Sequence, residues 1–206
     1  MIVITDGERA APRSVEWVVE RSLEGGARCV QLRMKGAPAR EMLRAARPLR
    51  ASTRAANALF FVNDRLDVAL AAEADGVHLG PDDLPVGPVR RAVSSRDLLL
   101  GFSTDDPDVA RRAVEDGADY IGCGAVWRTA SKDLGDEAIG TRGLDRVARA
   151  VPVPVVGIGG VTPERAAEVA RTSAAGVAVI SALMGADDPA RTVRRLLRPF
   201  EERASE

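Results

Sequence analysis

The chain has 206 residues, which suits one domain with a substantial buried core, so we expect residues 1–206 to fold as a single domain. Its 29 Lys and Arg residues nearly balance 30 Asp and Glu residues, which argues against a nucleic acid or a membrane surface as a partner bound through bulk charge. No apolar run reaches the roughly 20 residues of a membrane helix, and the first residues lack a signal-peptide pattern, so we expect a cytoplasmic protein with Cys29 and Cys123 as reduced, buried thiols.

Short apolar, β-rich runs alternate along the chain with longer stretches of helical character. In chain order, the predicted strands are Ile2–Thr5, Cys29–Leu32, Leu59–Val62, Gly76–Leu79, Leu98–Ser103, Tyr120–Gly122, Val155–Ile158 and Gly176–Ile180. The predicted helices are Ser14–Glu24, Ala39–Ala55, Leu66–Ala72, Val86–Val93, Pro107–Glu115, Gly143–Ala150, Pro163–Thr172 and Pro189–Leu197. The strands are almost wholly apolar, as is typical of parallel strands covered on both faces. Eight units in strict alternation favour closure, and we predict an α/β fold, a single (β/α)₈ TIM barrel.

The first polar signal lies at the end of the second predicted strand. Gln31, Arg33 and Lys35 share one side of an extended segment, because side chains alternate along a strand. In a barrel, Gln31 and Arg33 would point into the mouth and Lys35 would reach over it. Two cations and an amide suit a ligand with a multiply charged phosphate. A salt-bridged strand end would use the same residues, and the segment alone leaves both interpretations open.

Carboxylates follow the third and fourth predicted strands. Asn63 and Asp64 end the third strand, and Asp82 and Asp83 follow the fourth. Because neighbouring parallel strands end at one edge of the sheet, we expect Asp64 and Asp83 to bind Mg²⁺ jointly with a diphosphate. The alternatives are an N-cap role for Asp64 and an acidic turn at Asp82 and Asp83.

The last two predicted strands end in residues typical of a barrel phosphate site. Gly159 and Gly160 follow the seventh strand, and Ile180 and Ser181 follow the eighth. Backbone N–H groups and a helix N-terminus can hold a monophosphate there, and glycine permits its close approach. The place of the glycine pair in the order of strands supports this prediction.

A long segment, Cys123–Arg142, follows the sixth predicted strand. It carries Thr129, Ser131 and Lys132, and long loops over a barrel mouth are often lids. The alternative is a disordered insert. The single histidine, His78, lies within the apolar fourth strand, and we interpret it as structural rather than as a base.

These residues, in this order, resemble the thiamine-phosphate synthase family over almost the whole chain. The most specific matching motifs are Val30–Arg33 with Lys35, Asn63–Arg65, Ala74–Gly80, Gly117–Gly122, Ile158–Gly160 and Val179–Ala182. Members of this family join a hydroxymethylpyrimidine diphosphate to a thiazole phosphate, releasing pyrophosphate and forming thiamine monophosphate. The resemblance implies a Mg²⁺-dependent transferase whose partners are these two small-molecule substrates.

The resemblance also implies a role for each matching residue. Those at the pyrimidine would be Gln31 and Ser103. Those that hold the diphosphate would be Arg33, Lys35, Asn63 and Lys132, with Asp64 and Asp83 on Mg²⁺. Those at the thiazole phosphate would be Thr129, Ser131, Gly160, Ile180 and Ser181. The candidate catalytic residues are Lys132, Ser103 and Arg33.

Two alternatives to the synthase share its fold class. A sister group, the thiazole tautomerase, looks to lack several diphosphate-binding residues and to use a histidine near Ser103–Asp105. Here Asp105 occupies that position, while Lys35 and Lys132 are present. The second alternative, a non-catalytic barrel that binds phosphate ligands, is opposed by the carboxylates expected on Mg²⁺. The sequence leaves the oligomeric state open, a homo-oligomer included.

Overall fold

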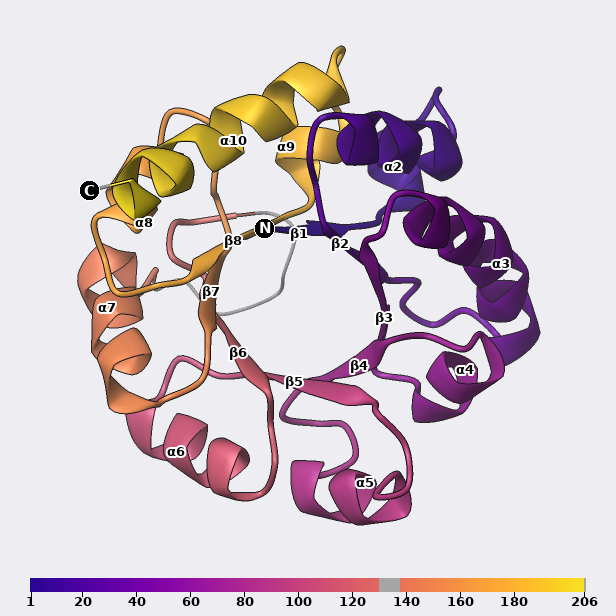
Figure 1. Cartoon of the computed structure of the whole chain (residues 1–206), viewed down its shortest axis with the longest axis horizontal. Coiled ribbons are helices and arrows are strands. Elements are labelled where there is room, and N and C mark those ends of the chain that lie inside the picture. The colour runs from indigo at the N-terminus through magenta and orange to yellow at the C-terminus, as the bar shows by residue number, and fades with distance from the viewer. Residues whose placement is uncertain (130–137, 206) are drawn as a thin grey trace.

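The computed structural model describes residues 1–129 and 138–205, and its strands close into a barrel (Figure 1). The strands are β1 (Ile2–Ile4), β2 (Cys29–Leu32), β3 (Leu59–Asn63), β4 (Gly76–Leu79), β5 (Leu99–Ser103), β6 (Tyr120–Cys123), β7 (Val155–Ile158) and β8 (Gly176–Val179). Each strand pairs in parallel with the next, and β8 pairs with β1. The predicted (β/α)₈ barrel is confirmed.

The helices form a ring outside the strands (Figure 1). They are α1 (Gly7–Ala10), α2 (Val15–Glu24), α3 (Ala39–Ala55), α4 (Leu66–Ala71), α5 (Val86–Ala92), α6 (Pro107–Glu115), α7 (Gly140–Ala150), α8 (Ala166–Ala170), α9 (Ser181–Met184) and α10 (Pro189–Ala204). The sequence does not predict α1 or α9, which are single turns after β1 and β8. A local bond explains α1, because the Asp6 carboxylate accepts from the N–H of Arg9 at 3.1 Å.

Several predicted helix ends are wrong. α7 begins earlier and α10 ends later than predicted. The side chain of Arg203 stabilises the longer α10, since it donates to three carbonyls beside β8, those of Ala170, Thr172 and Ala174. α8 begins only at Ala166, because the amides of Arg165 and Ala166 both donate to the Thr162 carbonyl and close a turn before the helix.

The core lies in two layers, one inside the barrel and one between the barrel and the helices. Ile2 and Ile4 line a hollow inside the barrel, so Val3 between them faces the helices. Val3 has no exposed surface, and neither have Val18 of α2 and Val193 of α10. Full burial of such a side chain stabilises the fold by about 1.5–3 kcal/mol. Among the residues that the structure describes, none of the helices combines the length and the apolar character that crossing a bilayer requires.

Both cysteines are free thiols, as predicted. Cys123 is buried, and burial raises its pKa to about 12, so it stays protonated at neutral pH. Cys29 is only half-buried, which corrects the prediction that both thiols are buried. Its position as the first residue of β2, at the end of the barrel where strands begin, accounts for the difference.

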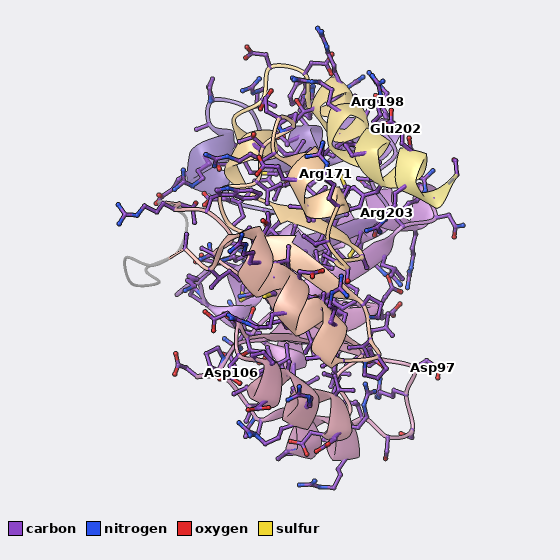
Figure 2. The ribbon with its side chains drawn as sticks, turned by 90° about the vertical axis from the view of Figure 1, so that its left-hand side faces the viewer. Asp97, Asp106, Arg171, Arg198, Glu202 and Arg203 are labelled. Atoms are coloured by element: carbon purple, nitrogen blue, oxygen red, sulfur yellow. The ribbon has the colours of Figure 1, made fainter. Side chains whose placement is uncertain are left out.

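The two ends of the barrel are seen from the side in Figure 2. Asp97, which precedes β5, lies at the end where the strands begin, and Asp106, which follows β5, lies at the opposite end. We call the first end the base and the second the mouth. Asp106 begins α6 as its N-cap and accepts from the amides of Asp108 and Val109 at 2.7 and 2.9 Å.

Arginine–aspartate pairs brace the strands at the base. Asp75, just before β4, accepts from both terminal nitrogens of Arg50 at 2.7 and 2.9 Å. It also accepts from the backbone N–H of Phe60 in β3 at 2.7 Å. Asp119, just before β6, repeats the arrangement with Arg90 of α5 at 2.5 Å and an amide of β5 at 2.7 Å. Each pair therefore ties one helix to two neighbouring strands.

Candidate active site

Many of the residues predicted for the site line two hollows at the mouth. The first lies inside the barrel, and we call it the inner hollow; its polar lining is Gln31, Arg33, Asn63, His78, Ser103 and Tyr120. The second lies over β7 and β8, and we call it the outer hollow; its lining includes Thr129, Gly159, Gly160, Ile180 and Ser181. Ile158, Ala178 and Ile180 line both, so the two hollows adjoin.

Two carboxylates face each other where β3 and β4 end. Asp64 and Asp83 lie within hydrogen-bonding distance of each other through their side chains. Burial, followed by the bond to Asp83 and the repulsion from its charge, raises the pKa of Asp64 to about 6. Lys35 and Arg33 lie close enough to act on the same pKa in the opposite direction. The structure therefore brings together the two carboxylates that the sequence places at neighbouring strand ends, and their binding of Mg²⁺ stays a prediction.

The local backbone explains how the pair forms. The backbone of Asp64 has a φ of 65°, in the left-handed region that Asp tolerates better than most residues. Its N–H donates to the His78 carbonyl at 2.8 Å, which continues the β3–β4 pairing past the strand. The N-cap of α4 is Arg65, so the N-cap alternative for Asp64 is wrong. Asp83 closes a turn, because its carboxylate accepts from the N–H of Gly80 at 2.7 Å.

The carboxylate pair fits Mg²⁺. Burial and the facing Asp83 together raise the pKa of Asp64 more than Lys35 and Arg33 lower it. Mg²⁺ commonly takes one or two protein carboxylates and completes its coordination with waters and substrate phosphates. Within residues 1–129 and 138–205, no group of three or more His, Cys, Asp or Glu residues is arranged to hold a metal. This donor set suits an ion that is shared with a phosphorylated ligand.

A glycine pair lets two segments lie against each other beside the outer hollow. The amides of Val126 and Trp127 donate to the carbonyls of Ile158 and Gly159 at 2.9 and 3.0 Å. Gly159 and Gly160 have φ values of 94° and 65°. A Cβ at Gly160 would lie 2.7 Å from the Cβ of Trp127, so a larger residue does not fit. The pair thus exposes backbone at the point where the sequence predicts a phosphate.

The side chain of Arg165 contacts this glycine pair at Gly160. Its guanidinium donates to the Gly160 carbonyl at 2.8 Å and lies over the Trp127 ring, 5.1 Å from the ring centre. The contact joins the turn before α8 to the segment after β6. The helix expected to begin at Pro163 therefore stands further from Gly160 than predicted, and the turn that carries Arg165 fills the interval.

A buried histidine contacts a predicted site residue. His78 Nε2 lies 2.8 Å from Ser103 Oγ, and His78 Nδ1 lies 2.8 Å from the Tyr120 hydroxyl. His78 is only 8% exposed, as expected of a structural residue. It also contacts Ser103, the side chain for which the family resemblance implies a place at the pyrimidine.

Comparison with known proteins places this geometry in a family. Residues 1–183 match the sequence profile of the family described as thiamine monophosphate synthase. The chain belongs to this family. The thiamine-phosphate synthase of Natronomonas pharaonis is 49% identical over 202 residues, which cover 97% of this chain and 94% of that protein. That of Moorella thermoacetica is 49% identical over 179 residues, which cover 87% and 85%.

Solved structures agree with the family's fold. The thiamine phosphate pyrophosphorylase of Pyrococcus furiosus superposes with a TM-score of 0.88 at 42% identity, covering 98% of this chain and 95% of that one. A 3-hexulose-6-phosphate synthase superposes with a TM-score of 0.70 at 16% identity, which shows a shared barrel and nothing more. The resemblance to thiamine-phosphate synthase stated from the motifs is confirmed.

The structure brings together most of the residues that the thiamine-phosphate synthase resemblance singles out. Those that line the inner hollow are Gln31, Arg33, Asn63, Ser103 and Ile180. Those that line the outer hollow are Thr129, Gly160, Ile180 and Ser181. Lys35 lies close enough to Asp64 to lower its pKa. Ser131 and Lys132 lie outside the described residues, so their roles and the lid stay predictions.

Four residues beside the family's predicted site were missed or given no role from the sequence: His78, Tyr120, Trp127 and Arg165. A signal was present for the first two, because the chain has a single histidine and a single tyrosine. Lysine is almost as rare, since Lys35 and Lys132 are the chain's two lysines, and both belong to the predicted site. No local signal marks Arg165, one of many arginines in the chain.

Proposed function

We propose that this protein is a thiamine-phosphate synthase, which couples hydroxymethylpyrimidine diphosphate with thiazole phosphate to give thiamine monophosphate and pyrophosphate. The observation that carries the proposal is the pair of adjoining hollows at the mouth. One is lined by two amides, a cation and hydroxyls, and the other by a glycine pair and hydroxyls. Two adjoining sites suit a reaction that joins two small molecules.

The inner hollow suits the pyrimidine diphosphate. Gln31 and Ser103 would contact the ring, and Arg33, Lys35 and Asn63 would hold the diphosphate with Lys132. Asp64 and Asp83 would hold Mg²⁺, which supplies charge neutralisation for the departing pyrophosphate when bound. Arg33 and Lys35, which already act on Asp64, add positive charge at the same place.

The outer hollow suits the thiazole phosphate. Gly160 and Ser181 expose backbone and hydroxyl groups where the last two strands end, with Thr129 opposite. Ser131, by its match to the family, would add a third hydroxyl. Fixing the phosphate here would orient the thiazole nitrogen toward the carbon that loses pyrophosphate. Loss of pyrophosphate from an electron-rich ring needs no strong base, so the residues bind, orient and neutralise charge.

The test is pyrophosphate release with both substrates and Mg²⁺. We expect release to require all three components and to stop when Mg²⁺ is chelated. Release with the pyrimidine substrate alone would indicate hydrolysis, and no release at all would favour a barrel that only binds phosphate ligands. Acceleration of thiazole tautomerisation at a rate comparable to coupling would favour the sister activity, although Asp105 stands where that group looks to use histidine.

A further inference from the structure

The Arg165 side chain reaches back along the chain to the glycine pair beside the outer hollow. Its guanidinium donates to the Gly160 carbonyl at 2.8 Å and covers the Trp127 ring, 5.1 Å from the ring centre. The turn that carries it is closed, because its own amide donates to the Thr162 carbonyl at 3.0 Å. The described lining of the outer hollow includes Gly160 and Val161 but not Arg165. Arg165 therefore acts on a ligand there through its neighbours rather than by touching it.

The segment that carries Trp127 is paired on both edges. On one edge, the amides of Val126 and Trp127 donate to carbonyls at the end of β7. On the other, the amides of Ile139 and Gly140 donate to the carbonyls of Ala125 and Val126, both at 3.0 Å. The Trp127 ring beneath the guanidinium is thus attached to a backbone that is hydrogen-bonded on both sides.

Gly160 is the residue of this contact with the most backbone freedom. Its φ of 65° lies in the left-handed region, and glycine rotates about its backbone bonds more freely than other residues. The peptide bond from Gly160 to Val161 is trans, so its C=O and N–H groups point in opposite directions. Because the carbonyl is bound to Arg165, the Val161 N–H points away from Arg165, and Val161 lines the outer hollow. The guanidinium thus fixes the orientation of this peptide.

We propose that Arg165 is a positioning residue that prepares the outer hollow for a phosphate monoester. This inference rests on the proposed function, in which that hollow holds the thiazole phosphate. Backbone N–H groups bind phosphate best when they are already in place, because ordering them during binding costs free energy. By holding the Gly160 carbonyl, Arg165 orders this peptide before the ligand arrives. A carbonyl turned into the hollow would instead repel the phosphate.

The first test measures binding with two probes, the thiazole phosphate and the thiazole alcohol that lacks the phosphate. The ratio of their dissociation constants, measured by calorimetry on the full chain, is the phosphate preference. Arg165→Ala should lower this preference at least about tenfold, the scale of one charge-assisted hydrogen bond, and should change the affinity for the alcohol less than about twofold. Equal weakening of both probes would mean that Arg165 only supports the fold. That result, an unchanged preference, or no binding of the phosphate probe to the unmodified protein would overturn the proposal.

Two further variants separate geometry from charge. Arg165→Lys keeps the positive charge but loses the planar group that covers the Trp127 ring, so the preference should fall at least about threefold. Full preference in this variant would contradict the positioning role, and it decides the question if Arg165→Ala fails to fold. Glu164→Gln removes the neighbouring charge on the same turn, which pairs with Arg195 at 2.7 Å, and should keep the preference. A loss in Glu164→Gln equal to that in Arg165→Ala would also contradict the proposal.

Turnover provides a separate measurement of the same role. The phosphate is unchanged by the proposed coupling, so weakening its site removes binding equally from substrate and transition state. In Arg165→Ala, KM for the thiazole phosphate should rise about tenfold, while kcat should fall less than about threefold. A fall in kcat with KM unchanged would contradict the proposal.

The binding measurements need no turnover. A protein whose phosphate preference is lost in Arg165→Ala, but which releases no pyrophosphate, would keep this inference and refute the proposed function. Pyrophosphate release together with full preference in Arg165→Ala would do the reverse.

Discussion

Asp75 at the base of the barrel and Asp64 at its mouth are both half-buried carboxylates, but their surroundings are opposite. Asp75 accepts two bonds from Arg50 and one from a strand amide, at 2.7–2.9 Å. Asp64 faces a second carboxylate, that of Asp83, and its pKa is raised to about 6, chiefly by burial. The side view in Figure 2 separates these two ends along the barrel axis.

The contrast shows how one fold divides two tasks. A carboxylate matched by a guanidinium and a backbone N–H stabilises the folded state. A carboxylate that faces another costs stability until a cation or ligand balances it. The base of a TIM barrel supports stability and the mouth carries the chemistry. Changes at the mouth should therefore affect turnover, and changes at the base should affect unfolding.

The largest effect is expected when the carboxylate pair is broken. Asp83→Ala removes one of the two proposed Mg²⁺ ligands, so kcat with Mg²⁺ should fall by more than about 10³-fold, beyond the loss of one charge contact. The melting temperature without Mg²⁺ should not fall appreciably. Steady-state pyrophosphate release measures kcat, and a thermal melt measures the melting temperature.

The neighbouring exposed residue provides the control. Asp82→Ala removes a carboxylate of the same turn and should leave kcat unchanged. Full activity in Asp83→Ala would remove Asp83 from the metal site. A collapse of the fold in this variant would mean that the mouth, like the base, serves stability.

The second prediction concerns Lys132, one of two lysines in the chain, which we expect to act at the mouth. If Lys132 grips the diphosphate as charge gathers on the leaving group, Lys132→Ala should lower kcat about 10²–10³-fold and change KM less. Lys132→Arg should restore activity only in part, because a planar guanidinium does not replace a compact ammonium.

A nearby exposed cation separates this role from general charge. Arg128 lies in the same segment, and Arg128→Ala should leave kcat nearly unchanged. If Lys132 only pairs with Asp133 or Asp136 in solvent, its loss should alter kcat by less than about fivefold, the scale of an exposed pair.

The fold could be predicted from the sequence because its signals are local and repeat. Apolar runs and helical stretches recur in every unit, and parallel pairing then brings Asp64 and Asp83 to neighbouring strand ends. The end of α10 could not be predicted, because it depends on Arg203 reaching carbonyls about 30 residues away in the chain, such as Thr172.

The site could be predicted only where residue type alone indicates chemistry. Charged residues and glycines at strand ends were found in this way. His78 joins Tyr120 and Ser103, which lie 42 and 25 residues away in the chain on other strands, and no local pattern shows that contact. Whether a buried polar residue belongs to the site or only to the core depends on its hydrogen-bond partners. Closure of the barrel brings those partners together.

The third prediction concerns the base. Asp75→Asn removes a charge that Arg50 meets with two bonds, and leaves either that guanidinium or the Phe60 amide without its acceptor. The free energy of unfolding should fall by about 2–3 kcal/mol, the cost of breaking a part-buried pair. Turnover per folded molecule should not change. Denaturant titration and an activity assay on the folded fraction measure both.

A matched pair nearby shows what an exposed contact contributes. Glu73→Gln breaks the bond between Glu73 and Arg54, whose side chains are 74% and 56% exposed, and should leave unfolding unchanged within error. Equal losses in Asp75→Asn and Glu73→Gln would contradict the view that the base pairs brace the strands.

The smallest expected effect is a gain, rather than a loss, in the free energy of unfolding. Asp64→Asn removes a charge that the folded state disfavours, so this variant should be more stable than the unmodified protein when Mg²⁺ is absent. The pKa of Asp64 rises from 3.8 to about 6 on folding, so the folded state binds more protons and the free energy of unfolding falls as pH rises through that interval. The gain in Asp64→Asn should be complete above about pH 6 and vanish below pH 3.8. Allowing for partial solvation, it should reach about 1–2 kcal/mol.

Asp67→Asn is the matched control, three residues along at the start of α4. A hydrogen bond from Arg65 is the main cause of the lowered pKa of Asp67, so its charge stabilises the folded state at neutral pH, and its removal should bring no gain. Mg²⁺ should raise the melting temperature of the unmodified protein and of Asp67→Asn more than that of Asp64→Asn. If Asp64→Asn were less stable at neutral pH, the carboxylate at the mouth would be matched as Asp75 is at the base, and the contrast between the two ends would fail.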